Sequence, residues 1–299
     1  MTIRVEWRMP QRAVLVVDDD AATREGLKEL LAQAGIAIDD AADGNTAWRK
    51  LEEHDFAVVL LDVHLPGIGG LEILQRCATK QHCPKIIIMT GSDASETVIA
   101  ALRGHAYDFI GKPIDPQHLV ATVRCALARD ETVPAIEVLS ARADWLELLV
   151  PCSRDAADRV QGFVQRLEMD LADDVRESVA LAFRELLLNG IEWGGQFDPT
   201  QRVRVACLRT PRLLLYRIAD PGPGFQIDNL SHASGARGPD RIAHDEVRQE
   251  KGIRPGGFGL VLIRALADEL VYNERRNEVV FIKYLASDLS PAIAEHANH

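Results

Sequence analysis

The stretch AVLVVDDD, residues 13–20, decides the fold of the first half of this chain, because five apolar residues run directly into three acids. A short, uninterrupted apolar run is typical of a parallel strand that is buried on both faces. The spacing of Leu27, Leu30 and Leu31 then predicts a helix that ends at Gly35. The stretch therefore predicts a strand–helix unit with carboxylates at the carboxyl end of its strand.

The same alternation of strand and helix continues as far as residue 128. Further strands are expected at residues 36–40, 56–61, 86–89 and 107–110, and further helices at 45–53, from 71 onward, at 96–103 and at 117–128. Five such units in succession predict an α/β fold built on a doubly wound, five-stranded parallel sheet. In sheets of this kind, function collects at the carboxyl ends of the strands.

Charged and hydroxyl side chains stand at four of these strand ends. The first strand ends at Asp18 and Asp19, the third at Asp62 and the fourth at Thr90, and the fifth leads to Lys112. A lone acid in such a place more often caps a helix or faces solvent. Three acids at one edge repel each other unless a hard cation such as Mg²⁺ lies among them. A carboxylate beside Mg²⁺ can attack a phosphoryl group, and a lysine and a hydroxyl can stabilise the added oxygens.

The motifs VVDDD, LLDVHLPGIGG, IMTGS and FIGKPI, in this order, make residues 12–130 resemble the response-regulator receiver family, whose fold is flavodoxin-like. The resemblance implies that Asp62 is phosphorylated by an upstream histidine kinase or phosphotransfer protein. It also implies the roles of the surrounding residues: Asp18, Asp19, Asp62 and the Val63 carbonyl around Mg²⁺, Thr90 as the switching hydroxyl, Lys112 as the phosphate-neutralising cation and Phe109 as the aromatic switch.

The second half has a different pattern, with strands expected at 145–151, 203–207 and 213–219. Between them lie two helices, and on the second of these Glu185 and Asn189 are four residues apart and share a face. The third strand runs into DPGPGF, which begins at Asp220 and places a carboxylate beside glycine backbone. After a polar stretch, residues 226–255, GGFGL opens a last helix through residue 270. Glycines at a helix start expose amide groups that can bind phosphate, although a tight loop explains a lone cluster equally well.

Three of these motifs, ELLLN, DPGPGF and GGFGL, make residues 140–286 resemble the nucleotide-binding domain of histidine kinases, gyrase-type ATPases and anti-sigma-factor serine kinases, the GHKL superfamily. The phrases LAFRELLLNGIEWG and GFGLVLIRALADEL are most similar to the anti-sigma kinase branch. The resemblance implies an α/β sandwich that binds ATP with Mg²⁺. It also implies the site residues: Asn189 for Mg²⁺, Asp220 for the adenine amine, Gly222, Gly224, Gly257 and Gly259 around the nucleotide, and Glu185 as general base.

Two departures from these families bear on activity. Trp193 stands where the anti-sigma kinase branch often has histidine, and an indole cannot offer the same charge to phosphate, so turnover could be slow or absent. Four basic residues of the polar stretch could compensate or could belong to an ordinary solvated loop: Arg237, Arg241, Lys251 and Arg254. No segment resembles the dimerisation helices with a phosphoacceptor histidine, and neither His105 nor His118 has that context. An autophosphorylating sensor kinase is therefore not expected.

Composition supports two folded domains in 299 residues, with 47% hydrophobic and 26% charged residues. The net charge is −11, and both halves are acidic: 14 basic and 19 acidic residues up to Asp130, and 20 and 26 after it. This balance argues against a nucleic-acid or membrane partner. The N-terminal residues lack the apolar core of a signal peptide, and the five cysteines form no CxxC pair. We therefore expect a cytoplasmic protein with reduced thiols.

The expected organisation is a receiver domain over residues 1–129, a linker over 130–141, a GHKL ATP-binding domain over 142–287 and a tail over 288–299. The leading hypothesis is a response regulator whose output domain is a Ser/Thr protein kinase acting on an anti-sigma-antagonist protein. One alternative is an ATP-binding module that sequesters a sigma factor or antagonist without catalysis. Another is a kinase that acts on histidine or aspartate of a separate protein. Because both modules commonly dimerise in the families they resemble, a homodimer is expected.

Overall fold

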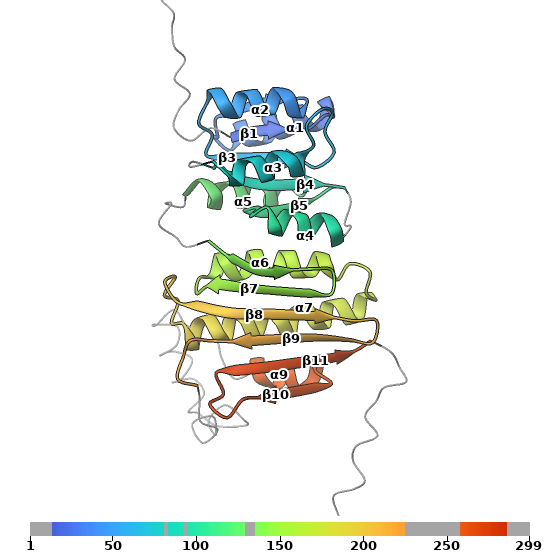
Figure 1. The fold of residues 1–299 in the computed structure, drawn as a ribbon, viewed down its shortest axis with the longest axis vertical. Helices are drawn as coiled ribbons and strands as arrows, with labels where there is room; N and C mark the ends of the chain where they lie inside the picture. Colours follow the sequence, from blue (N-terminus) through green and yellow to red (C-terminus); the bar gives the residue numbers. More distant parts are fainter. Residues whose placement is uncertain (1–13, 81–82, 92–94, 129–134, 225–257, 286–299) are drawn as a thin grey trace, which may run out of the picture. The chain divides into compact units, whose positions relative to one another are not determined.

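The computed structural model describes residues 14–80, 83–91, 95–128, 135–224 and 258–285. By contacts between Cα atoms, the chain divides into two compact units, of which the first comprises residues 1–133 and 162–169 and the second the remainder. Each unit is built around its own sheet (Figure 1). No helix in the described part of the chain is long and apolar enough to cross a membrane.

The first sheet has five parallel strands in the order β2-β1-β3-β4-β5. Its strands are β1 (Val14–Val17), β2 (Ile38–Ala41), β3 (Val58–Asp62), β4 (Lys85–Thr90) and β5 (Asp108–Gly111). Its helices are α1 (Ala21–Gln33), α2 (Gly44–Glu53), α3 (Gly70–Ala78), α4 (Ser95–Arg103) and α5 (Pro116–Ala128). The alternating elements expected from the sequence are all present, and the strand order confirms the doubly wound parallel sheet.

Burial explains why these strands read as apolar runs. Every residue of β1 and β3 is buried, since helices cover both faces of a parallel sheet. The apolar character stops at the last residue of β3, Asp62, and directly after β1, at Asp18. Helix α1 begins directly after Asp20, whose side chain accepts a hydrogen bond from the Thr23 amide at 3.0 Å. The third acid of VVDDD is therefore a helix cap.

The second sheet has six antiparallel strands in the order β10-β11-β9-β8-β7-β6. From residue 137 onward the described chain forms β6 (Glu137–Ala141), β7 (Trp145–Pro151), α6 (Arg154–Leu167), α7 (Asp173–Asn189), the π-helical turn η1 (Gly190–Gly194), β8 (Arg202–Arg209), β9 (Leu213–Ala219), α9 (Phe258–Leu266), β10 (Glu269–Tyr272) and β11 (Glu278–Tyr284). Buried residues alternate along β7 and β9, because one face of the sheet carries the helices. A helix-covered antiparallel sheet confirms the expected α/β sandwich.

Two expectations for this half are wrong. Residues 137–141 were expected in a linker, but they form β6, an edge strand that pairs with β7. Its burial alternates weakly, and Leu139 is 43% exposed, so the segment lacks the strong apolar pattern of an internal strand. The last helix was expected to continue to residue 270, but α9 ends at Leu266 and Leu270 lies in β10. The apolar side chain of Leu270 fits the spacing of a helix as well as that of a strand, and pairing with β11 makes this segment a strand.

Candidate functional site

The first candidate site lies at the carboxyl edge of the parallel sheet. Carboxylate oxygens of Asp18, Asp19 and Asp62 all lie within 4.8 Å of one another. The side chain of Asp18 is fully buried, Asp62 is 5% exposed and Asp19 is exposed. Asp18 and Asp19 directly follow β1 and Asp62 is the last residue of β3, so the parallel register of these neighbouring strands brings the three together.

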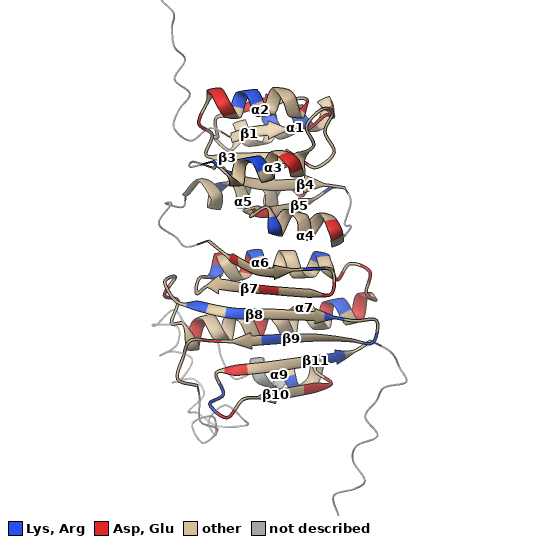
Figure 2. Cartoon of the chain, in the orientation of Figure 1, with Lys and Arg blue, Asp and Glu red and all other residues tan. Residues whose placement is uncertain are grey.

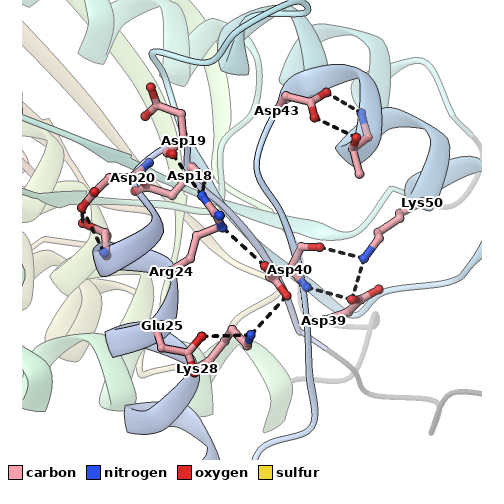
Figure 3. Close-up of polar contacts among 12 residues, drawn as sticks. Asp18, Asp19, Asp20, Arg24, Glu25, Lys28, Asp39, Asp40, Asp43 and Lys50 are labelled. Carbon is pink, nitrogen blue, oxygen red and sulfur yellow. Dashed lines mark hydrogen bonds and ion pairs between the residues drawn. The ribbon is translucent and has the colours of Figure 1, made fainter.

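Backbone and side-chain contacts hold this loop in place (Figure 3). Oδ1 of Asp18 accepts from the Asp20 amide at 2.9 Å, and Oδ1 of Asp62 accepts from the His64 amide at 3.1 Å. Arg24 donates from one guanidinium nitrogen to the carbonyls of Asp18, at 2.8 Å, and Asp19, at 3.0 Å. The Asp19 side chain points away from these contacts in Figure 3. Asp19 therefore has a carboxylate that a ligand can reach from solvent.

Lys112 supplies the positive charge of the site. Its Nζ donates to Oδ2 of Asp18 at 2.7 Å and also to Oδ2 of Asp62. Burial raises the pKa of Asp18, and the bond from Lys112 lowers it only in part. Burial lowers the pKa of Lys112, but its bonds to the two carboxylates more than reverse this effect and raise it. The lysine is therefore held charged between the two acids.

Thr90 and Phe109 lie on β4 and β5, the strands that follow β3 in the sheet. Thr90 is fully buried at the end of β4, where it is paired with Gly111 of β5. Its carbonyl accepts the Lys112 amide at 2.8 Å, so the hydroxyl-bearing residue and the lysine lie at one edge. Phe109 lies in β5, three residues before the lysine. The Val63 carbonyl accepts the Gly70 amide at 3.1 Å, which leaves its second lone pair for a ligand.

The residues present fit a magnesium ion. Three carboxylates that converge at this distance are a preferred ligand set for a hard divalent cation. Their formal charge is −3, and Lys112 reduces it to −2, so one divalent cation would balance the site. Lys112 also lines an open surface groove between α1 and the segment from Lys112 to Pro116.

The second candidate site is built around the end of α7 and the end of β9. Glu185 and Asn189 occupy the last two turns of α7, and both are half-buried. The helix leads without a break into η1. A Cβ atom on Gly190, the residue after Asn189, would lie 3.4 Å from the Cβ of Asp220. The ELLLN and DPGPGF motifs, thirty residues apart in sequence, therefore meet at this point.

Asp220 is held in a pocket of glycine backbone. A Cβ on Gly194 would lie 2.2 Å from its Oδ1, and one on Gly222 would lie 2.8 Å from the same atom. Oδ1 accepts the Gly222 amide at 2.8 Å, while burial raises the pKa of the carboxyl group. The Asp220 amide donates to the Asn277 carbonyl at 2.8 Å, which ties the loop to the turn between β10 and β11. The carboxylate is thus fixed beside backbone that a flat ring can approach closely.

The remaining motif residues fall into two groups. Gly224 has φ of +84°, and a Cβ there would lie 1.6 Å from the carbonyl oxygen of Arg275, so only glycine fits. Gly259 lies in the first turn of α9, which packs against α7. The others lie outside the described residues: Gly257 and the four basic residues Arg237, Arg241, Lys251 and Arg254.

Sequence reasoning missed the glycines that close around Asp220. NGIEWGG supplies Gly190, Gly194 and Gly195, and their density directly after the ELLLN motif was the available signal. A Cβ on Gly195 would lie 2.1 Å from Sγ of Cys152, so this glycine packs against the end of β7. Between these glycines Trp193 is 55% exposed.

Comparison with known proteins gives each half of the chain a family. Residues 14–124 match the model of the response regulator receiver domain, and residues 150–283 match that of the histidine kinase-like ATPase domain. The DNA-binding response regulator MtrA of Mycobacterium tuberculosis is 35% identical over 187 residues, which cover 62% of this chain and 79% of MtrA. The transcriptional regulatory protein HprR of Escherichia coli is 27% identical over 212 residues, 70% of this chain and 91% of HprR.

Solved structures include a response regulator from Chloroflexus aurantiacus that is 32% identical in sequence. The matched region covers 40% of this chain and 98% of the solved chain, with a TM-score of 0.38.

Proposed function

Because the chain belongs to the response-regulator family and carries a histidine kinase-like ATPase domain, we propose that phosphorylation of Asp62 controls an ATP-dependent output. The observation that carries the first part is the convergence of Asp18, Asp19 and Asp62 with Lys112 at one sheet edge. An upstream histidine kinase or phosphotransfer protein provides the phosphoryl group.

The residues of the first site divide the chemistry among them. Oδ2 of Asp62 attacks the phosphorus atom of the donor's phosphohistidine, the P–N bond breaks and the donor's imidazole leaves, while Oδ1 of Asp62 keeps its hydrogen bond from the His64 amide. Lys112 then moves its bond from the Asp62 carboxylate to the oxygens of the new acyl phosphate. Thr90 donates its hydroxyl to one of these oxygens. Asp18, Asp19 and Asp62 would hold magnesium, which would offset the negative charge of the phosphoryl group.

We propose that the second domain binds Mg-ATP and acts as a Ser/Thr kinase on an anti-sigma-antagonist protein. Asp220 accepts a hydrogen bond from the adenine amine, Asn189 ligates the magnesium of Mg-ATP, and Gly222, Gly224, Gly257 and Gly259 surround the nucleotide. Glu185 takes the proton from the hydroxyl group that attacks the γ-phosphorus of ATP, the bond from this phosphorus to the bridging oxygen breaks, and ADP leaves. The hairpin of β6 and β7 supports an acceptor on a separate protein, because residues 137–151 form strands of the second sheet instead of long dimerisation helices.

A protein partner also agrees with the charge of the chain. MtrA is described as DNA-binding, but here the residues after the receiver domain match an ATPase model. Both halves of the chain are acidic, and charges of both signs are mixed along α6 and α7 (Figure 2). Nucleic acid, with its phosphate backbone, is therefore not the proposed ligand. We also propose that the protein forms a homodimer and is located in the cytoplasm.

The test is transfer of labelled phosphate from ATP to a candidate antagonist protein by the full chain. Asp62 is phosphorylated with a small-molecule donor in one arm, and Asp62→Asn serves as the unphosphorylated control. Acid-stable label on the partner, lost in Glu185→Gln, supports the Ser/Thr kinase. Label that is lost in acid points instead to histidine or aspartate of the partner. The absence of transfer in both arms, with ATP still bound, would contradict catalysis.

Trp193 favours a second candidate function, a binding module without catalysis. It is a large apolar side chain, 55% exposed, beside the pocket of glycines around Asp220. Exposed tryptophan is typical of contacts with a protein partner. In this function the ATP-bound domain captures a sigma factor or antagonist by its surface. Glu185→Gln then leaves capture intact, whereas Trp193→Ala weakens it, as a pull-down with the candidate partner measures.

A further inference from the structure

Arg24 of α1 links the loop after β1 to the neighbouring strand β2 (Figure 3). One terminal nitrogen of its guanidinium, Nη1, donates to the carbonyl of Asp18 at 2.8 Å and to that of Asp19 at 3.0 Å. The Nε atom of Arg24 lies 3.4 Å from Oδ2 of Asp40 on β2. Since the Arg24 side chain is only 16% exposed, water competes little for these partners. One planar group therefore contacts two consecutive carbonyls and an acid on another strand.

Asp40 is a fixed anchor for this arginine. The Asp40 carbonyl accepts a hydrogen bond from Nζ of Lys50 at 2.7 Å, and the Asp40 amide donates to Oδ1 of Asp39 at 2.8 Å. Lys50 also donates to the same oxygen of Asp39 at 2.6 Å, which ties α2 to β2. Because β2 pairs with β1 in parallel, the anchor belongs to the same sheet as the acids of the first site.

The two carbonyls that Arg24 contacts belong to residues whose carboxylates lie in the first site, Asp18 and Asp19. In each residue the side chain and the carbonyl group leave the same Cα atom, so a turn of the peptide unit displaces the carboxylate. Mg²⁺ accepts oxygen ligands only in near-ideal octahedral geometry at about 2.0–2.1 Å. Loss of a contact that orients a metal ligand therefore costs about 10–100-fold in metal affinity.

We propose that Arg24 is a positioning residue for the magnesium site: it holds the backbone of Asp18 and Asp19 so that their carboxylates keep their spacing, and Asp40 holds Arg24. The inference rests on the proposed phosphorylation of Asp62, since magnesium belongs to that function. The sign of the effect separates positioning from charge. The positive charge of Arg24 beside three acids by itself weakens the binding of a cation, whereas positioning of the ligands strengthens it.

The test is calorimetric titration of the full chain with Mg²⁺ in the absence of nucleotide. Asp19→Asn removes one ligand and so identifies the heat that belongs to the first site. Arg24→Met should raise the Kd for Mg²⁺ about tenfold, although it removes a positive charge. The matched control is Lys28→Met, because Nζ of Lys28 also lies 3.4 Å from Asp40 but bonds Glu25 instead of the loop carbonyls. This change should leave the Kd within about twofold of its original value.

Two further variants test the arginine and its anchor separately. Arg24→Lys keeps the charge, but one ammonium replaces the two nitrogens that face the loop and Asp40, so its Kd should lie between those of the unchanged chain and Arg24→Met. Asp40→Asn should weaken Mg²⁺ binding in the unchanged chain and have no effect in Arg24→Met, because the anchor acts through the arginine.

Phosphorylation of Asp62 by a small-molecule donor gives a second measurement. In Arg24→Met the Mg²⁺ concentration for half-maximal rate should rise with the Kd, while the rate at saturating Mg²⁺ stays near that of the unchanged chain. A collapsed site would lower the rate at every Mg²⁺ concentration, which would contradict positioning.

The proposal is overturned if Arg24→Met binds Mg²⁺ as tightly as the unchanged chain or more tightly, or if Lys28→Met loses as much affinity. Should Arg24→Met fail to fold, Arg24→Lys decides, and a Kd equal to that of the unchanged chain then overturns the proposal. If the unchanged chain shows no Mg²⁺ binding that Asp19→Asn removes, the magnesium site of the proposed function fails together with this inference.

Discussion

Replacing Lys112 with methionine removes the one cation that bonds both Asp18 and Asp62 among the described residues and keeps a side chain of similar length. Asp18 is fully buried and Asp62 is 5% exposed, so neither carboxylate recovers full hydration. Coulomb's law at an effective dielectric constant of about 20 gives about 6 kcal/mol of attraction at the 2.7 Å separation of Lys112 and Asp18. Part of this attraction offsets the desolvation of the three groups in the native site.

The net cost of breaking a buried ion pair by removing one partner is about 3–5 kcal/mol. Because the Lys112 side chain is 26% exposed, water reaches the site, and we expect the lower end of that range, about 3 kcal/mol. The control is Lys50→Met, which breaks the half-buried pair of Lys50 and Asp39 at 2.6 Å. Asp39 is 23% exposed, whereas Asp18 is fully buried, so water screens the control pair more and it should be worth only about 1 kcal/mol or less.

Hydrogen exchange of the peptides that contain β1 and β3 measures the opening free energy of the first unit in the full chain. Without Mg²⁺, Lys112→Met should lower this free energy about 3 kcal/mol below that of the unchanged protein. Added Mg²⁺ should restore much of it, since a divalent cation among the same carboxylates replaces the lost charge. The reasoning is refuted if Lys112→Met costs no more than Lys50→Met, or if Mg²⁺ stabilises neither protein.

Three further changes test the second unit. Asp220→Asn should weaken ATP binding about tenfold or more by calorimetry, because a hydrogen bond to a charged acceptor is worth about 1.5–3 kcal/mol, and unchanged affinity would remove Asp220 from the site. Gly194→Ala places a Cβ 2.2 Å from Oδ1 of Asp220, so it should lower the affinity for ATP and reduce the stability by about 1–3 kcal/mol. The control is Gly162→Ala in α6, where a Cβ meets nothing within 4 Å, and this change should be neutral or stabilising. Arg217 lowers the pKa of Glu278, so the stability that this ion pair contributes is fully present above the unfolded pKa of the carboxyl group and is lost as the pH falls through the lower folded pKa. Arg217→Met should therefore lower the free energy of unfolding in urea by about 1 kcal/mol at pH 7 and by less at pH 3. An equal loss at both pH values would contradict the ion pair as the source of this stability.

The receiver half could be predicted almost completely, because its information is local. A parallel strand buried on both faces is an unbroken apolar run, and the residue that ends the run marks the sheet edge, as at Asp62. The elements of the second half were harder to predict where pairing decides the structure. Leu270 continues the helical spacing of α9, yet it lies in β10 because β11 offers a partner. For the same reason, residues that were expected in a linker form β6, because β7 offers a pairing partner.

The sites show the same division between local and non-local information. Strand ends predicted the cluster of Asp18, Asp19 and Asp62, since the topology of a parallel sheet brings such ends together. Spacing could not predict that Asp20 caps α1, because an acid after a strand can serve either purpose. Nor could it predict the glycine pocket around Asp220, where Gly194 matters only because α7 and β9 bring it to the carboxylate.

Charge at the first site explains how a single phosphoryl group could change the state of the domain. Three carboxylates and Lys112 carry a formal charge of −2, which one divalent cation neutralises. Phosphorylation replaces the single charge of Asp62 by about −1.5 to −2 on the phosphoryl oxygens. The bond from Lys112 to Asp62 then has a competing acceptor, and the buried Thr90 lies at the same edge to donate to it. In the proposed function the energetic signal would therefore arise where β3, β4 and β5 end, because the added negative charge would regroup donors that are already in place.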